Sequence, residues 1–258
     1  IGKGCQNKPL RALGTHTMSN HIPTEVYLSF IDKTIEIHWD YHAWLMTAVW
    51  FGLVPFALMA VRYFKPKPTL YGIPKGTSKL SPKLIWWTIH FTCLYLALGL
   101  SLAGMLAAIV SNGGISGSTH SWWGLATITL AILQLVSAWF RGSHGGKHGA
   151  NSNPNEPSTW RGDHYDMTPQ RRWFEAYHKT AGYFTMVLAM GAVASGLAQY
   201  WMPIIAIYIV TVIVGTLLLA VWLERKGFRQ DMYHSVYGNH PQHPFNKRRK
   251  LSKKCSSM

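Results

Sequence analysis

Four histidines are the residues of this sequence best suited to chemistry. His42, His90, His120 and His178 each lie near the start of one of four long apolar segments. Ionisable side chains within a membrane are costly and tend to be paired or functional. A single such histidine would be explained by packing, whereas one per segment at a similar depth indicates a shared role. Because two imidazoles can serve as the axial ligands of one haem iron, we consider haem binding first.

The other histidines lie in more polar stretches. They are His16 and His21 near the N-terminus, His38 before the first apolar segment, His144, His148 and His164 in a Gly/Asn/Pro loop, and His234, His240 and His243 in the tail. His38 and His42 are four residues apart and could form a metal clip on one helical face. Such a clip would leave His120 unpaired in the membrane. We therefore expect His42 to be a ligand and His38 to be an interfacial residue, near a haem propionate or the exit path for electrons.

Five apolar segments are long enough to position these residues in a membrane. A hydrocarbon core of about 30 Å requires about 20 helical residues. The segments run approximately over Tyr41–Phe64, Leu84–Val110, His120–Phe140, Trp173–Gln199 and Trp201–Leu223. We therefore expect an all-α integral membrane protein with five transmembrane helices, of which the first four form a haem-binding four-helix bundle.

The distribution of Lys and Arg predicts the orientation of these helices. On the side of the N-terminus the sequence carries only Lys3, Lys8, Arg11 and Lys33, and the rest of the 25 Lys and Arg lie on the other side. Short cytoplasmic loops are enriched in Lys and Arg. This rule places the N-terminus outside and the C-terminus in the cytoplasm, in a bacterial inner membrane or an equivalent one.

The same orientation divides the chain into three parts. We expect an extracytoplasmic segment over 1–39, a transmembrane domain over 40–223 and a basic cytoplasmic tail over 224–258. The chain is 48% hydrophobic with 12 Trp, which is too apolar for a nucleic-acid-binding tail. The net charge of +15 is therefore interpreted as a topology signal and a contact with anionic lipid. We expect a lipid bilayer and no nucleic acid among the partners.

The alternating direction of the spans pairs the four histidines. The first and third spans start outside, so His42 and His120 lie toward the outer leaflet. The second and fourth start inside, so His90 and His178 lie toward the inner one. Imidazoles on facing helices of a bundle can form a cofactor site in its core. One site in each leaflet would place two irons about 20 Å apart.

Cysteine usage bears on how a haem would be held. Cys5, Cys93 and Cys255 are widely separated, which excludes a disulfide framework and a C-x-x-C zinc pattern. The sequence also contains no C-x-x-C-H motif for covalent haem attachment. We therefore expect two non-covalent haem b groups.

Two glycines lie next to the predicted ligands. Gly124 follows His120 and Gly182 follows His178 by one helical turn, on the same face. A glycine at this place allows a flat macrocycle to approach the helix backbone. Close packing between helices explains a glycine equally well, because small residues are favoured at such interfaces.

Cationic side chains lie near the inner pair. They are Arg62, Lys65, Arg141, Arg171 and Arg172. Such groups could pair with haem propionates or with an anionic electron donor. For Arg171 and Arg172 we favour the simpler interpretation, which is the ordinary basic flank of a cytoplasmic helix end.

Four stretches around the histidines resemble the cytochrome b561 family, in particular the type associated with DOMON domains. The stretches are "HAWLMTAVWFGLVPFALMAVRYFK", "WWTIHFTCLYLALGLSLAG", "HSWWGLATITLAILQLVSAWFR" and "RRWFEAYHKTAGYFTMVLAM". The resemblance covers about residues 39–223, and the order and spacing of the motifs carry it. It implies a bundle that binds two b-type haems and passes electrons across the membrane.

The sequence also departs from the family pattern. Gly142 stands where the family usually has a proline, and an asparagine common in the fourth span is absent. The 40 residues before the first span are too few for the β-sandwich of a DOMON domain. The electron donor is therefore left open among ascorbate, a quinol and a partner redox subunit, and the acceptor is not identified.

Three functions follow from these observations. The first is a di-haem b-type cytochrome, acting as an electron-transfer protein or transmembrane oxidoreductase without an assigned catalytic residue. The second is a haem-bearing membrane anchor and electron-transfer subunit of a larger respiratory or oxidoreductase complex, or a homodimer. The third is a haem-free structural or transport protein, which has little support because few acidic residues lie within the spans.

Overall fold

The computed structural model describes residues 23–29, 31–141, 151–160 and 169–248. Five helical spans are long and apolar enough to cross a membrane. They are Trp39–Tyr63, Ile85–Ser111 (α3), Thr119–Trp139 (α4), Pro169–Gln199 (α5) and Pro203–Arg225 (α6). The prediction of a mostly helical chain with five such spans is confirmed, and it indicates a membrane protein.

The first span is built from three consecutive pieces. These are α1 (Trp39–Thr47), the π-helical segment η1 (Ala48–Leu53) and α2 (Val54–Tyr63). Pro55 lies in the first turn of α2, where it cannot donate a helical hydrogen bond. A local widening to a π-helix is one way in which a helix accommodates an extra residue. The span therefore changes its helical geometry about halfway along its length.

Prolines also determine two helix starts. Helix α6 begins at Pro203 rather than at Trp201, and α5 begins at Pro169 rather than at Trp173. A proline suits the first turn of a helix because its missing N–H would have no partner there. The apolar run of this span begins later, at Trp173, because the first turn of α5 is polar.

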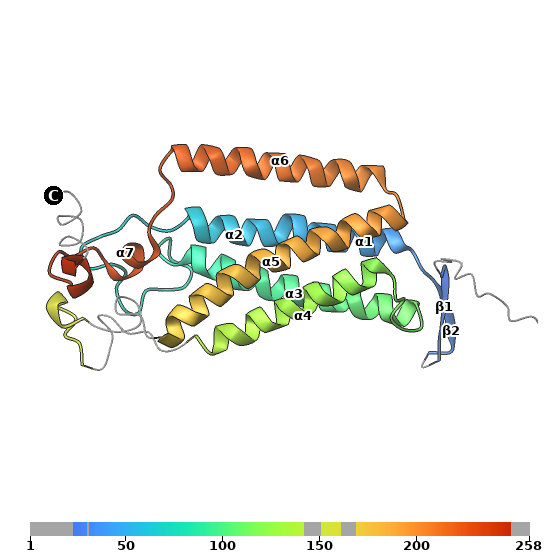
Figure 1. Cartoon of the computed structure of the whole chain (residues 1–258), viewed down its shortest axis with the longest axis horizontal. Coiled ribbons are helices and arrows are strands. Elements are labelled where there is room, and N and C mark those ends of the chain that lie inside the picture. Colours follow the sequence, from blue (N-terminus) through green and yellow to red (C-terminus); the bar gives the residue numbers. More distant parts are fainter. Residues whose placement is uncertain (1–22, 30, 142–150, 161–168, 249–258) are drawn as a thin grey trace, which may run out of the picture.

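Four of the spans pack around one another. The first span packs on α3 and α5, and both of these helices pack on α4. Helix α6 lies outside this group and packs on the first span, as Figure 1 shows. A buried apolar cluster joins η1 to its neighbours and comprises Val49, Trp50, Phe51, Val54, Ala97, Ala189, Ile205 and Ile209.

A short β-hairpin lies at one end of the bundle, next to α1 (Figure 1). Strand β1 (Glu25–Leu28) pairs antiparallel with β2 (Lys33–Glu36), with Val26 opposite Ile35. We call this the hairpin end. The all-α prediction did not include the hairpin, because every residue of β2 is exposed and the strand lacks the alternating pattern that marks a half-buried strand.

The opposite end carries a small folded cap. We define the cap as residues 69–73, 151–160 and 232–246, which include the 3-10 turn η2 (Pro157–Thr159) and helix α7 (Met232–Tyr237). Ile73 N donates to Val236 O at 2.9 Å, and Asn239 N donates to Thr69 O at 3.0 Å. A Cβ added at Gly72, whose φ is +67°, would lie 2.4 Å from Val236 O. The backbones of two distant segments therefore meet where a side chain could not fit.

Candidate functional site

The structure brings His42 and His120 together at the hairpin end. His42 lies in the first turn of α1 and His120 at the start of α4, and their ring centroids are 6.1 Å apart at an interplanar angle of 85°. Since α3 and α5 both pack between α1 and α4, the two rings meet inside the bundle. The predicted pairing of these two histidines agrees with this geometry.

Backbone carbonyls orient both rings of this pair. The Nδ1 of His120 is 2.8 Å from Ala192 O, and the ring of His42 is hydrogen-bonded to the backbone of Gly104. An imidazole N–H that donates to a carbonyl fixes the tautomer and leaves the other ring nitrogen with a lone pair. The 6.1 Å between ring centres leaves room for one metal ion at the distance of about 2 Å typical of imidazole–metal bonds.

Two glycines of this site were missed by the sequence analysis. A Cβ on Gly196 would lie 3.0 Å from Nδ1 of His120, and one on Gly104 would lie 3.8 Å from Nδ1 of His42. A signal for them exists in the spacing. Gly104 follows His90 by 14 residues and Gly196 follows His178 by 18, which are about four and five helical turns. Each glycine is therefore close in phase to the histidine at the other end of its own helix.

The predicted glycines Gly124 and Gly182 have open surroundings. Among the described residues, nothing lies within 4 Å of a Cβ added at Gly124. At Gly182 the nearest atom is Nε2 of Gln134 at 4.0 Å. Packing against a neighbouring helix therefore does not explain Gly124 in this part of the chain.

The second pair, His90 and His178, lies at the cap end. The two residues interact electrostatically, and Nδ1 of His90 is 3.3 Å from Ala57 O. Phe174 stacks on His178 with ring centroids 5.2 Å apart, and Trp87 lies 5.9 Å from His90. Helices α3 and α5 thus contribute one histidine each to the cap-end pair, and each of the two rings lies beside an aromatic side chain.

Two buried polar groups at this end have no hydrogen-bond partner among the described residues. They are Nδ1 of His178 and the side-chain amide of Gln134. Buried polar groups are normally satisfied, so each exception needs an explanation. A planar group with polar substituents, bound beside Gly182, would fit the residues present.

Cations surround the cap-end pair. Arg141, Arg171 and Lys179 all act electrostatically on His178. The Arg141 guanidinium lies 5.3 Å from the ring centre of Trp87, which in turn lies beside His90. The environment of this pair is therefore distinctly positive.

Arg171 differs from an ordinary exposed flanking residue. Its side chain is buried, and its Nε lies 3.3 Å from Oε1 of Glu175. Arg172, in contrast, is exposed, as expected for a basic flank. Burial of Arg171 follows from the polar first turn of α5, which extends the helix beyond its apolar run and packs it against the cap end.

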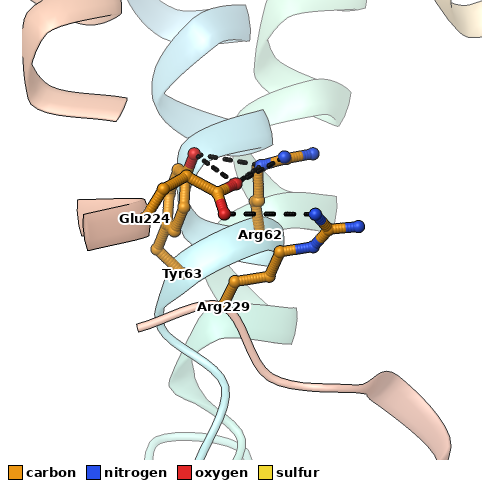
Figure 2. A network of polar contacts seen from close by, with 4 residues as sticks. All are labelled: Arg62, Tyr63, Glu224 and Arg229. Atoms are coloured by element: carbon orange, nitrogen blue, oxygen red, sulfur yellow. Dashed lines mark hydrogen bonds and ion pairs between the residues drawn. The ribbon is translucent and has the colours of Figure 1, made fainter. Parts of the chain in front are cut away.

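Arg62 lies at the same end in a polar network with Tyr63, Glu224 and Arg229 (Figure 2). Nη2 of Arg62 is 2.5 Å from Oε1 of Glu224, to which the Tyr63 hydroxyl also donates at 3.2 Å, and Arg229 lies 4.0 Å from the same carboxylate. Arg62 therefore ties α2 to α6 rather than standing free for a propionate. Burial lowers the pKa of Lys65, and the nearby carboxylate of Asp231 opposes this shift.

His38 lies apart from the histidine pairs. It is exposed at the N-terminal end of α1, 4.0 Å from Glu36 and beside the ring of Tyr41. In the described residues, no group of three or more His, Cys, Asp or Glu converges to hold a metal ion. This geometry agrees with an interfacial position for His38 and does not support a metal clip with His42.

Some residues from the sequence analysis lie outside the described ranges. They are His16, His21, His144, His148 and His164, together with Gly142.

Comparisons with protein-family models, with curated proteins and with solved structures found no match. The functional argument therefore depends on the geometry of the two histidine pairs.

Proposed function

We propose that this chain is a di-haem b-type cytochrome that carries electrons across a membrane. One haem would be held by His42 and His120 at the hairpin end, and the other by His90 and His178 at the cap end. The observation that carries the proposal is the juxtaposition of His42 and His120, whose ring centroids lie 6.1 Å apart at an interplanar angle of 85°, on two helices of the bundle. The matching pair at the opposite end extends it to two sites.

The residues of these sites have separate roles in the proposal. The carbonyls of Ala192 and Ala57 hold the rings of His120 and His90 so that one nitrogen remains available as a ligand. Gly124 and Gly182 leave room beside the helix backbones. Arg141 and its cationic neighbours balance negative charge at the cap end. A haem bound by two imidazoles supplies one-electron redox chemistry.

A buried apolar core lies between the two histidine pairs and would separate the two proposed haems. Val49, Trp50 and Phe51 are buried in η1, about midway along the first span. Tight apolar packing here excludes water from the interior of the bundle. This separation keeps the two sites chemically distinct while both stay within one bundle.

The distribution of charge supports an orientation with the cap end in the cytoplasm. Most Lys and Arg lie on that side of the sequence, as in the cytoplasmic loops of membrane proteins. The donor would be ascorbate, a quinol or a partner redox subunit. Testing which of these reductants reduces the purified protein, and which site responds first, would determine the donor and the direction of electron flow.

The proposal is tested by a reduced-minus-oxidised spectrum combined with haem quantitation on the purified protein. We expect two low-spin b-type haems per chain. A value of one haem or none would overturn the two-site proposal. Iron bound without haem would favour a different metal chemistry.

A second candidate is a membrane subunit of a larger respiratory or oxidoreductase complex. The observation that favours it is the folded cap, which together with the exposed hairpin presents ordered surfaces at both ends of the bundle. Purification under mild conditions distinguishes the two functions. Stoichiometric partner subunits would support the complex, and full reduction of the isolated chain by a small-molecule donor would support an independent cytochrome.

A further inference from the structure

A buried histidine lies at the centre of the cap. His243 and Trp160 are both fully buried, and their ring centroids are 5.8 Å apart. Tyr71 lies 6.3 Å from Trp160 and 5.3 Å from His240. The cluster therefore has four rings, one each from residues 69–73 and 151–160 and two from residues 232–246.

The hydrogen bond of His243 requires a neutral imidazole. Nδ1 of His243 accepts from the backbone N–H of Phe245 at 3.1 Å. A nitrogen that accepts cannot also carry a proton. Protonation of this ring would set two N–H groups against each other and place a charge on a fully buried side chain.

The charged and titratable groups around His243 add to this effect. His234 and His240 act on it electrostatically, and His234 itself lies 3.7 Å from Asp231. The 69–73 segment places Tyr71 next to the cluster, and the 151–160 segment places the Trp160 ring against His243. Burial, followed by the two neighbouring histidines, lowers the pKa of His243 to about 4.

We propose that the cap is a pH-sensitive latch in which protonation of His243 releases the 232–246 segment from residues 69–73 and 151–160. The neutral ring is the form that the closed cap binds. A histidine in the released segment titrates near pH 6.5. The latch is therefore fully closed above about pH 6.5 and loses stability progressively as the pH falls toward 4.

The latch is connected to the bundle through α7. The Tyr233 hydroxyl donates to Glu175 Oε1, three residues before His178 on α5. Burial and then the adjacent Glu175 raise the pKa of the Tyr233 phenol, so it stays a donor. Opening the latch would loosen this contact and expose the cap-end surface. The proposal concerns the cap itself and does not depend on whether the bundle binds haem.

Hydrogen–deuterium exchange on the full chain in detergent tests this proposal. Protection factors, corrected for the intrinsic pH dependence of exchange, are compared at pH 7.5 and pH 5.0. We expect peptides covering 69–76 and 232–246 to lose at least tenfold in protection at pH 5.0, and peptides of α6 to lose none. Unchanged protection in the cap would overturn the latch.

Two variants separate titration from general acid instability. His243→Asn keeps an acceptor oxygen near the place of Nδ1 but cannot be protonated, so its cap should keep its protection at pH 5.0. The same loss as in the native chain would overturn the role of His243. If this variant is unprotected at pH 7.5, His243→Gln takes its place, and an undiminished pH response there would overturn the latch. His38→Asn, at the other end of the bundle, is the matched control and should respond to pH like the native chain.

Discussion

The two ends of the bundle hold equivalent histidine pairs in different surroundings. At the hairpin end both rings are hydrogen-bonded to backbone groups and lie next to Gly104 and Gly196. At the cap end the rings contact aromatic side chains and cations, and Nδ1 of His178 has no partner among the described residues. The hairpin-end site is thus shaped mainly by close packing, and the cap-end site mainly by charge and polar groups.

The difference indicates distinct redox properties for the two proposed haems. Positive charge near a haem favours its reduced form, because reduction removes positive charge. We therefore expect the cap-end site, with Arg141, Arg171 and Lys179 around it, to have the higher potential. The hairpin end, where the environment is set by backbone contacts, should be less sensitive to changes of nearby charge.

Replacing one predicted haem ligand should have the largest effect on the difference between the two ends. His120→Ala should abolish the hairpin-end haem and leave the cap-end haem in place, and His178→Ala should do the reverse, because each pair shares no residue with the other. Haem quantitation and low-temperature spectra of the two variants provide the measurement. His38→Ala is the control and should keep both haems, and loss of the hairpin-end haem in this variant would mean that His42 was assigned wrongly.

A methyl group at Gly196 should affect only the hairpin end. Gly196→Ala places a Cβ 3.0 Å from His120 Nδ1, which pushes the ring from its position and should reduce haem occupancy at that site by half or more. Gly215→Ala in α6 is the matched control, since nothing described lies within 4 Å of its Cβ. Equal occupancy in the two variants would show that His120 tolerates displacement.

The charge argument is tested at Arg141. Arg141→Gln should lower the potential of the cap-end haem by an amount on the order of tens of millivolts, because one positive charge is lost near it. The hairpin-end potential should stay unchanged in a redox titration. Arg172→Gln, which removes an exposed cation nearby, should have a smaller effect, and equal shifts in both variants would attribute the potential to general surface charge.

The smallest effect is expected for the Arg62–Glu224 pair. Both side chains are about one-third or more exposed, so water screens the pair and Glu224→Gln should lower the midpoint of thermal unfolding only slightly. Thermal unfolding followed by helical circular dichroism measures this change. Glu36→Gln at the hairpin end is the control, and a large loss of thermal stability in Glu224→Gln alone would show that α6 depends on this contact for its attachment.

The fold was predictable where a local pattern determines it. Long apolar runs defined the five spans to within a few residues, and the alternation of the spans predicted which histidines meet. Helix α6 begins two residues later than the apolar run because proline, and not hydropathy, determines its start. The pairing of His42 with His120 needed only the direction of the helices, which the loop lengths and charges supply.

The remaining features depend on contacts between distant segments. The cap is held by backbone hydrogen bonds between residues near Ile73 and Val236, and no local pattern marks such a contact. Arg171 has the composition of a flank, yet it is buried because Glu175 and the cap cover it. The role of Gly104 and Gly196 beside the histidine rings can be recognised only when the histidine on the facing helix is known.

The π-helical segment η1 sets the rotational phase between the two halves of the first span. His42 lies before it, and Ala57, whose carbonyl holds His90, lies after it. Each residue turns an α-helix by about 100°. Deleting one residue within Ala48–Leu53 would restore regular winding and turn the two halves relative to each other, so that only one of them could keep its histidine contact. The additional residue in the middle of the span thus fixes the rotation at which both halves can make their histidine contacts.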